Sequence, residues 1–264
     1  SEIFVIIVEK ESELLQIWPC ILRENILEFI NHKHADYCDI LSINSSKIAT
    51  EFILENSQIK RIDFKNIRKE SILFNLFDGI ENKFISKDVN ASKLLLSRTD
   101  SFPSNFTHFI YRQRRRLKRI LNKYNGTLEF ISSVDRDFPL DQITRLKDKM
   151  IHSGIRSSDF LEDSILQLSQ SLYEEGILEI SVLSIRSKIC GISFYFNQEN
   201  EYFLWIDLYD NQKMMNLYHN TLFIKHMSEK EDVVINFGRG DYSYKIQNFS
   251  PVVFPIYNLY IFKN

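Results

Sequence analysis

Glycine and proline are scarce in this sequence, with 7 and 5 residues among 264. Such a composition excludes collagen-like, low-complexity and largely disordered chains. No apolar run approaches the ~20 residues that a membrane-spanning helix needs. The first residues resemble a strand with acidic flanks rather than a signal peptide. Together these absences predict a soluble, cytoplasmic protein.

Cysteine is also rare, since only Cys20, Cys38 and Cys190 are present and they lie far apart in the sequence. An odd number of distant cysteines fits reduced thiols better than a disulfide framework or a zinc site. Cys190 lies in an apolar stretch without a basic neighbour, which indicates a core thiol rather than a nucleophile. His32 and His34 have metal-like spacing, but this pair alone does not make a metal site, so we predict none.

A large excess of either charge is lacking too, because 33 basic and 35 acidic residues give a net charge of -2. This balance argues against nucleic acid as the partner of the whole chain. What the sequence does contain is an apolar fraction of 44%, with 21 Phe and 12 Tyr, which is enough for a substantial core. The length allows one large domain or two small ones.

A polar, turn-rich segment at residues 97–104 predicts a boundary between a small N-terminal α/β domain, residues 1–100, and a larger domain, residues 101–264. In the first domain the pattern of apolar residues predicts strands at 3–8, 39–43, 59–64, 72–77 and 83–85, and helices at 11–30 and 47–54. No catalytic motif stands out there. There is no periodic repeat, although the first domain could be a degenerate copy of the second.

The second domain has a clearer order of elements. We expect helices at 105–124, 140–150, 160–175 and from about residue 217 to 227. We expect strands at 127–132, 178–185, 189–197, 202–208, 233–235 and one or two within 252–262. Hairpin-length turns make the three strands between 178 and 208 antiparallel. The crossover from 202–208 through a helix to 233–235 predicts a parallel pair. The fold class is therefore α/β (α+β), with a mixed, mostly antiparallel sheet flanked by helices.

The segment Phe237–Lys245 reads FGRGDYSYK. With the strand–helix–strand before it and the element order of the second domain, this motif resembles the C-terminal half of the GNAT-like acyltransferases that are named after cellulose biosynthesis. The resemblance covers roughly half of the chain and implies a GNAT domain, with two GNAT-like halves in tandem as an option. The sequence departs from the family pattern at 217–220, where a glycine-containing turn is usual and the residues are Leu217, Tyr218, His219 and Asn220.

The resemblance also implies the donor and its site. Acyl-CoA is the expected co-substrate, and the family binds the pantetheine arm of the thioester along a strand edge, here Trp205 to Tyr209. The pyrophosphate is then expected at the N-terminus of the next helix, around Leu217, Tyr218, His219 and Asn220, where free N–H groups and the helix dipole favour an anion.

Three residues are candidates for proton transfer. Asp207 lies in an otherwise apolar strand, and a buried carboxylate is costly unless it is paired or used. It is either the general base that deprotonates or orients the amine, or a salt-bridged or outward-facing residue. Asp241 and Tyr244 follow the next strand, and Tyr244 either protonates the leaving thiolate or packs beside the strand.

Other polar residues are candidates for binding. Arg239 and Lys245 either hold substrate or cofactor phosphates or form an ion pair with Asp241. His152 and Arg156 fall in the break between two helices, which the fold places over the acceptor pocket. The helix at 105–124 carries a basic face with three interpretations: a solvated surface, an anion site for phosphate groups, or a nucleic-acid site. That face comprises Arg112, Arg114, Arg115, Arg116, Lys118 and Arg119.

The resemblance implies a metal-independent N-acyltransferase that moves an acetyl or 3-hydroxybutyryl group from acyl-CoA by direct transfer. The resemblance implies that the acceptor is the amino group of a nucleotide-linked, dTDP-type deoxyamino sugar used for surface polysaccharides such as the O-antigen of lipopolysaccharide. One alternative is an aminoacyl-tRNA-dependent transferase that acts on peptidoglycan precursors. The other is a catalytically inactive GNAT-like module that binds a ligand. Monomer and dimer both remain open.

Overall fold

The computed structural model describes residues 2–30, 32, 35–98, 102–104, 109–210, 214–230, 232–240 and 242–263. The chain forms two compact units. The first comprises Ser1–Ala91, Arg239–Asp241 and Val253–Asn264, and the second comprises Ser92–Gly238 and Tyr242–Val252. Strand β6 (Lys83–Leu96) contributes residues to both units. The two are described separately below.

The first unit is built on a sheet with the strand order β1-β2-β3-β5-β12. Its strands are β1 (Glu2–Lys10), β2 (Glu13–Arg23), β3 (Ile26–Phe29), β5 (Arg61–Arg68) and β12 (Val252–Phe262), with the short β4 (Leu41–Ser42) beside β2. Strands β3 and β5 are parallel, whereas β5 and β12 are antiparallel. Helix α1 (Ile48–Glu55) packs on this sheet through Ala49 and Ile53, which are buried in the core of the unit.

The helix predicted for residues 11–30 is wrong, since these residues form β2 and β3. Residues Glu11 and Ser12 have positive φ angles of 51° and 69° and turn the chain from β1 into an antiparallel β2. In β2 every second side chain is buried, including Trp18 and Cys20. The apolar residues that recur every three or four positions therefore do not mark a helix here. They belong to a strand whose buried side chains alternate along one face.

The strand predicted for residues 72–77 is also wrong. Helix α2 (Leu73–Leu76) occupies this apolar stretch, and the Ser71 hydroxyl accepts a hydrogen bond of 3.1 Å from the Leu73 N–H at its start. In a short run of apolar residues, the spacing of polar and apolar positions does not distinguish a strand from a helix. The strand predicted at 83–85 does exist, but it continues to Leu96 as β6.

The second unit confirms the predicted mixed, mostly antiparallel sheet flanked by helices. Its strands follow the order β11-β10-β9-β8-β7. They are β7 (Gly126–Ile131), β8 (Glu179–Ile185), β9 (Lys188–Gln198), β10 (Glu201–Tyr209) and β11 (Val233–Arg239). The pairs from β7 to β10 are antiparallel, and β10 pairs with β11 in parallel, as predicted.

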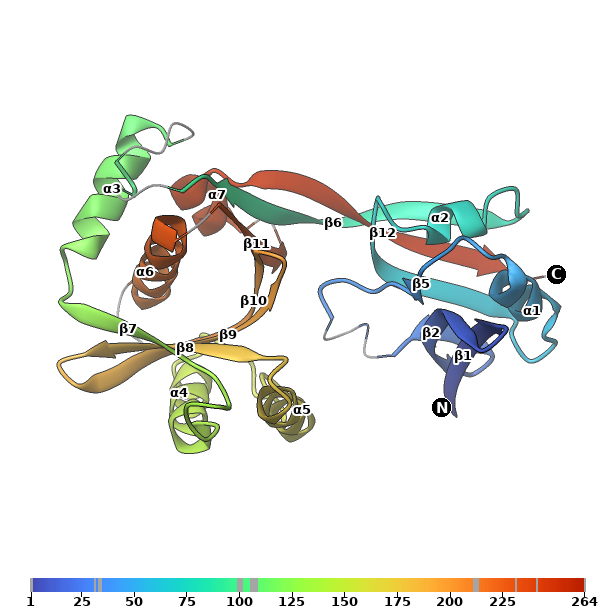
Figure 1. Cartoon of the computed structure of the whole chain (residues 1–264), viewed down its shortest axis with the longest axis horizontal. Helices are drawn as coiled ribbons and strands as arrows, with labels where there is room; N and C mark the ends of the chain where they lie inside the picture. Colours follow the sequence, from blue (N-terminus) through green and yellow to red (C-terminus); the bar gives the residue numbers. More distant parts are fainter. Residues whose placement is uncertain are drawn as a thin grey trace. The chain divides into compact units, whose positions relative to one another are not determined.

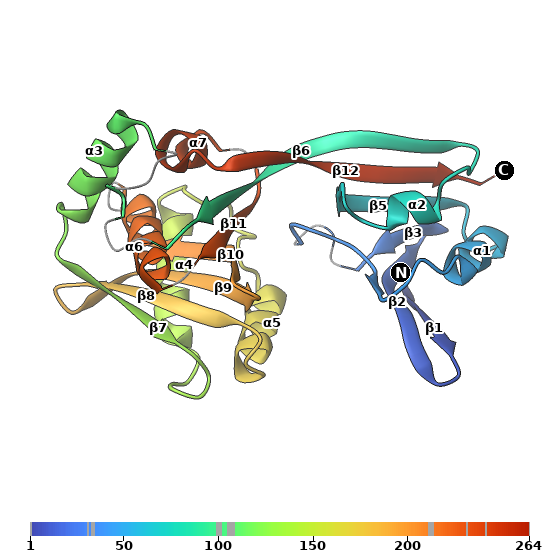
Figure 2. The same cartoon turned by 45° about the horizontal axis from the view of Figure 1, so that its top comes forward.

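Helices cover both faces of this second sheet. Helices α4 (Leu140–His152) and α5 (Asp163–Glu174) lie on one face, and α6 (Met215–Lys230) lies on the other (Figures 1 and 2). Separate apolar clusters fill the two interfaces. Helix α3 (Tyr111–Leu121) packs against α6 and α7 (Ser243–Phe249), a short helix that was not predicted. The predicted start of the basic helix at 105–108 lies outside the described residues. Among the described helices, none is both long and apolar enough to span a bilayer.

Strands β10 and β11 are in register over only a few residues. Glu201, Tyr202 and Phe203 face Val234, Ile235 and Asn236, and no further pair is formed between the described parts of the two strands. Beyond Phe203, β10 continues alongside β9 alone. The register with β9 shifts between Leu204 and Ile206, which leaves Trp205 as a bulge residue. From the bulge onward, one edge of β10 is thus not paired with the described part of β11.

Candidate active site

The carboxylate of Asp207 lies on this last part of β10. Ser193 is its cross-strand neighbour in β9, and the Ser193 hydroxyl donates a hydrogen bond of 2.5 Å to Asp207 Oδ1. On the other side, the Asn220 amide of helix α6 lies 3.5 Å from Asp207 Oδ2. Among the described residues, none of the ion pairs includes Asp207, so the predicted salt-bridged alternative is not observed. The carboxylate is half-buried and is held by neutral groups from a strand and a helix.

His219 lies behind this carboxylate and is buried, with only 3% of its surface exposed. Its Nε2 is 2.9 Å from the Ser181 hydroxyl of β8. The imidazole packs directly onto Gly191, where an added Cβ would lie 2.7 Å from His219 Nδ1. Burial lowers the pKa of His219 to about 4, although the nearby Asp207 carboxylate acts in the opposite direction. The ring is therefore neutral near pH 7 and supports the strands beneath Asp207.

Two tyrosine hydroxyls lie within electrostatic range of the same carboxylate. Burial raises the pKa of Tyr244 in α7, and the charge of Asp207 and the neighbouring Tyr209 raise it further. Burial also raises the pKa of Tyr209 at the end of β10, with a further increase from Asp207. The Asn216 side chain is hydrogen-bonded to Tyr244, and the Arg156 guanidinium lowers both tyrosine pKa values. Both hydroxyls stay protonated well above neutral pH and are able to donate.

The structure therefore brings together Asp207, Tyr209 and Tyr244, with Arg156 and Asn220 nearby, from four separate segments of the chain. Asp241, the third predicted proton-transfer residue, lies outside the described residues. Arg156 is exposed in the loop between α4 and α5, with its guanidinium carbon 4.8 Å from the centre of the Phe160 ring. It is the cation of this cluster.

Three residues predicted to bind the donor have mainly packing roles. Trp205 is partly buried at the bulge, with its ring 5.4 Å from that of Phe196. Leu217 belongs to the apolar core. The Tyr218 hydroxyl donates a 2.8 Å hydrogen bond to the Tyr124 carbonyl and accepts one of 3.0 Å from the Gly126 N–H. Tyr218 thus fixes the segment after α3 against α6.

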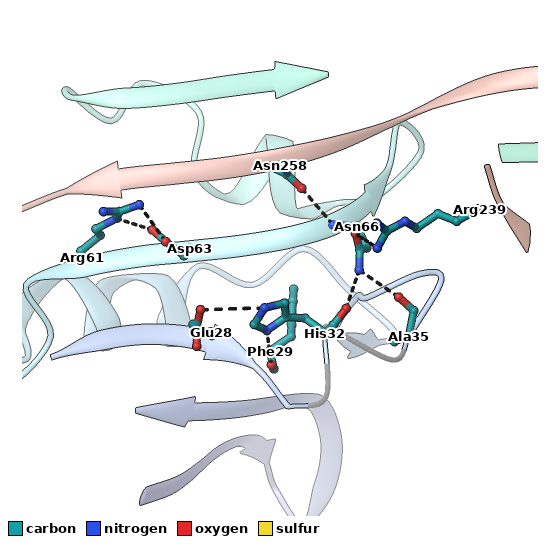
Figure 3. A network of polar contacts seen from close by, with 9 residues as sticks. All are labelled: Glu28, Phe29, His32, Ala35, Arg61, Asp63, Asn66, Arg239 and Asn258. Atoms are coloured by element: carbon teal, nitrogen blue, oxygen red, sulfur yellow. Dashed lines mark hydrogen bonds and ion pairs between the residues drawn. The ribbon is translucent and has the colours of Figure 1, made fainter. Parts of the chain in front are cut away.

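Arg239, Lys245 and His152 have contacts of their own. Lys245 is buried, and its ammonium group donates a 2.7 Å hydrogen bond to the Phe237 carbonyl. Arg239 lies in the first unit, where it donates to Asn66 Oδ1 (Figure 3). His152 is exposed at the end of α4, with Nδ1 2.6 Å from the carbonyl of its own helix at Asp148. None of these contacts involves the cluster around Asp207.

Sequence reasoning missed the residues that support Asp207 from behind, namely Ser181, Ser193 and Asn216. The two serines do carry a signal, because each is a polar residue inside an apolar strand, in EISVLSI and KICGISFYF. Both are buried, and both bond to a side chain of the site. Among the described residues there is no group of His, Cys, Asp and Glu that could bind a metal ion.

Comparison with known proteins places this geometry in a family. The acetyltransferase (GNAT) domain family matches residues 104–246, more than half of the chain. No curated protein sequence matches the chain significantly.

Several solved structures share the fold. L-PGS from Bacillus licheniformis is similar with a TM-score of 0.68 and 15% identity, over 98% of this chain and 84% of that one. FemX is similar with a TM-score of 0.60 and 10% identity, over 99% and 89% of the two chains. A tandem GNAT protein from the clavulanic acid biosynthesis pathway has a TM-score of 0.52 and 6% identity, over 96% and 81%. At these identities the likeness concerns the fold alone.

Proposed function

The chain belongs to the acetyltransferase (GNAT) domain family, and from this membership we propose that it transfers an acyl group from acyl-CoA to an amine at Asp207, Tyr209 and Tyr244. The observation that carries the proposal is the convergence of one carboxylate and two protonated hydroxyls beside the unpaired edge of β10. The acceptor that we propose is the amino group of a nucleotide-linked deoxyamino sugar. The transferred group is acetyl or 3-hydroxybutyryl.

The unpaired edge of β10 fits the amide-rich arm of a CoA thioester. Beyond Phe203 the backbone groups on this edge have no partner in the described part of β11. In the described part of the chain, the Tyr209 N–H points to the weakly accepting sulfur of Met150, at 3.4 Å. Unpaired strand edges bind extended chains by adding a strand. Such pairing would bring the thioester carbonyl toward Asp207.

The side chains of the cluster have complementary proton roles. The amine must be neutral to attack, and the Asp207 carboxylate accepts its proton as the C–N bond forms. The C–S bond then breaks, and the thiolate takes a proton from Tyr244, whose hydroxyl stays protonated near neutral pH. One proton leaves the amine and one reaches the sulfur, so the protein needs only to be reprotonated at Tyr244 and deprotonated at Asp207. Ser193 and Asn220 keep the carboxylate in place.

The test is acyl transfer by the purified chain. Acetyl-CoA and 3-hydroxybutyryl-CoA would each be incubated with a panel of nucleotide-linked amino sugars, with thiol release and product mass as readouts. We expect thiol release that depends on an amino sugar, and an increase in sugar mass equal to the acyl group. Tyr244→Phe should lower kcat by about 10²-fold, within the usual range for general acid–base groups. Tyr242→Phe, which alters an exposed neighbour, should have little effect.

A second candidate is transfer from an aminoacyl ester of tRNA to a peptidoglycan precursor. This alternative is favoured by the fold alone, which is similar to the folds of L-PGS and FemX over almost the whole chain. The same cluster could act on an ester donor, because the leaving ribose oxygen needs a proton as a thiolate does. Transfer from charged tRNA without any thiol release from acyl-CoA would favour this candidate over the first. If no donor is used by the chain, the inactive binding module becomes the better interpretation.

A further inference from the structure

The basic face of helix α3 lines a cavity of about 420 Å³. Four arginines and one lysine of this region contribute to its wall, together with Tyr111: Arg112, Arg115, Arg116, Arg119 and Lys123. Met214, which directly precedes α6, closes the other side. The cations thus surround a concave site rather than a flat helix surface.

A second cavity of about 620 Å³ lies next to the first and shares Lys123 with it. Its wall includes Tyr124, Arg186 in the turn between β8 and β9, and Lys188, the first residue of β9, which also lies 3.4 Å from the Asp210 carboxylate. Each cavity lies in the size range of small-molecule sites, which is roughly 300–1,000 Å³. The shared lysine makes the two a continuous cationic region.

The positive charge of the first cavity is not neutralised by described neighbours. In the part of the chain that the structure describes, no ion pair involves Arg112, Arg115, Arg116, Arg119 or Lys123. Arg114 on the same helix behaves differently, because its guanidinium donates to the carbonyls of Phe109 at 2.7 Å and Ser104 at 3.3 Å. Like charges in one cavity repel each other, and a bound anion would offset this cost. The chain as a whole has a net charge of -2, so the cluster is a local feature.

The walls of the two cavities are held in place by the core of the unit. Helix α3 packs against α6, with Leu117 and Ile120 buried between them. The Tyr218 hydroxyl of α6 bonds to the backbone of Tyr124 and Gly126, just after α3. The cations therefore project from a supported scaffold, which limits the ordering cost of binding.

We propose that these two cavities form a binding site for a nucleoside diphosphate. Guanidinium groups bind phosphate oxygens in a bidentate manner, and the rings of Tyr111 and Tyr124 offer surfaces for a base. The proposal rests on the proposed function, because acyl-CoA and a nucleotide-linked sugar both contain a nucleoside diphosphate. RNA is the less favoured ligand, since each cavity is of small-molecule size.

Direct binding to the whole chain tests this site without any turnover. Calorimetric titration with CoA, dTDP, UDP and inorganic pyrophosphate would compare the wild type with Arg115→Ala/Arg119→Ala. We expect the double variant to raise the Kd of at least one nucleotide by about tenfold or more, because hydrogen bonds to charged groups are among the strong ones. Selective loss of CoA binding would assign the site to the donor, and selective loss of dTDP or UDP would assign it to the acceptor.

The matched control is Lys118→Ala. Lys118 is an exposed cation on the same helix that does not line either cavity. The Lys118→Ala variant should change the Kd of each nucleotide by less than about twofold if contacts in the cavities matter more than overall charge. An equal effect of both variants would contradict the site, as would the absence of nucleotide binding by the wild type at millimolar concentration.

A short RNA hairpin provides the last arm of this experiment. Tighter binding of the hairpin than of any nucleotide, with the same dependence on Arg115 and Arg119, would overturn the nucleoside diphosphate in favour of RNA. The result is separable from the proposed function. Nucleotide binding without acyl transfer would support this site and reject the proposed reaction. Acyl transfer that is unaffected by the double variant would support the reaction and reject this site.

Discussion

Ser193 and Asp207 face each other across strands β9 and β10, and the serine hydroxyl donates a 2.5 Å hydrogen bond to Asp207 Oδ1. The carboxylate is thus held by a neutral donor rather than by a cation. We predict that Asp207→Asn, which keeps the shape but not the basicity, lowers kcat/KM by about 10²-fold or more. Steady-state kinetics of acyl transfer would measure this loss. Circular dichroism would show whether the fold is retained.

Ser193→Ala is the companion variant for Asp207. It removes the hydrogen bond and leaves the carboxylate, so the loss in kcat/KM should be smaller than that of Asp207→Asn. Equal activity of Asp207→Asn and the wild type would exclude the carboxylate as the base and move the search to Asp241.

The buried, neutral His219 predicts a specific dependence of stability on pH. Its folded-state pKa of about 4 lies below the ordinary value of 6.5. Between these pH values the unfolded chain binds a proton that the folded chain does not, so the free energy of unfolding falls as the pH falls from about 6.5 to 4. At 1.36 kcal/mol per pKa unit the loss is roughly 3 kcal/mol.

Urea unfolding of the wild type and His219→Gln at several pH values would measure this effect. The glutamine retains an amide for Ser181 but does not titrate. The difference between the two proteins should therefore grow as the pH rises from 4 toward 6.5 and be constant above it. Parallel pH profiles of the two proteins would show that folding does not shift the pKa of His219.

The fold of the second unit could be predicted because its strands and helices have clear periods and short turns. The first unit was harder, and β2 shows why. Gln16 faces the core and breaks the apolar alternation, but its amide donates to the backbone of Asn44 and Ser46 and its oxygen accepts from Trp18 Nε1. A buried polar residue satisfied by distant partners cannot be recognised from local sequence.

A candidate site residue could be proposed from the sequence where chemistry and an unusual environment coincide. Asp207 is a carboxylate in an apolar strand, and the structure places Tyr244 and Tyr209 near it. Lys245 shows the limit of such reasoning. It belongs to the same motif as Tyr244, yet it is buried and its ammonium group bonds to a backbone carbonyl. The direction of a side chain in a short helix depends on tertiary packing, which the motif does not encode.

Gly191 leaves the space that the His219 ring fills. An alanine Cβ at this position would lie 2.7 Å from His219 Nδ1 and 3.4 Å from the Leu183 Cβ. We predict that Gly191→Ala destabilises the protein by about 1–3 kcal/mol, as overpacking of a core does. Chemical unfolding would measure this, and the double variant Gly191→Ala/His219→Ala is the control, because removal of the ring should recover part of the loss. Additive losses would mean that the alanine clashes with something other than the ring.

Arg239 provides a test between a phosphate-binding and a structural role for the motif Gly238-Arg239-Gly240. Its guanidinium donates a 2.7 Å hydrogen bond to Asn66 Oδ1 and lies 3.7 Å from the Asp88 carboxylate. Asn66 has a positive φ of 61° and donates to the carbonyls of His32 and Ala35 (Figure 3). We predict that Arg239→Ala lowers the free energy of unfolding by about 1–3 kcal/mol and leaves nucleotide Kd values unchanged.

A double-mutant cycle with Asn66→Gly isolates this contact, because glycine accepts the positive φ without strain. The two losses should be less than additive if Arg239 acts through Asn66, since removal of either partner breaks the same hydrogen bond. Calorimetry on the same proteins would show whether any phosphate ligand depends on the arginine. Weaker nucleotide binding by Arg239→Ala at unchanged stability would instead assign the guanidinium to substrate, which is one of the two roles that the sequence left open.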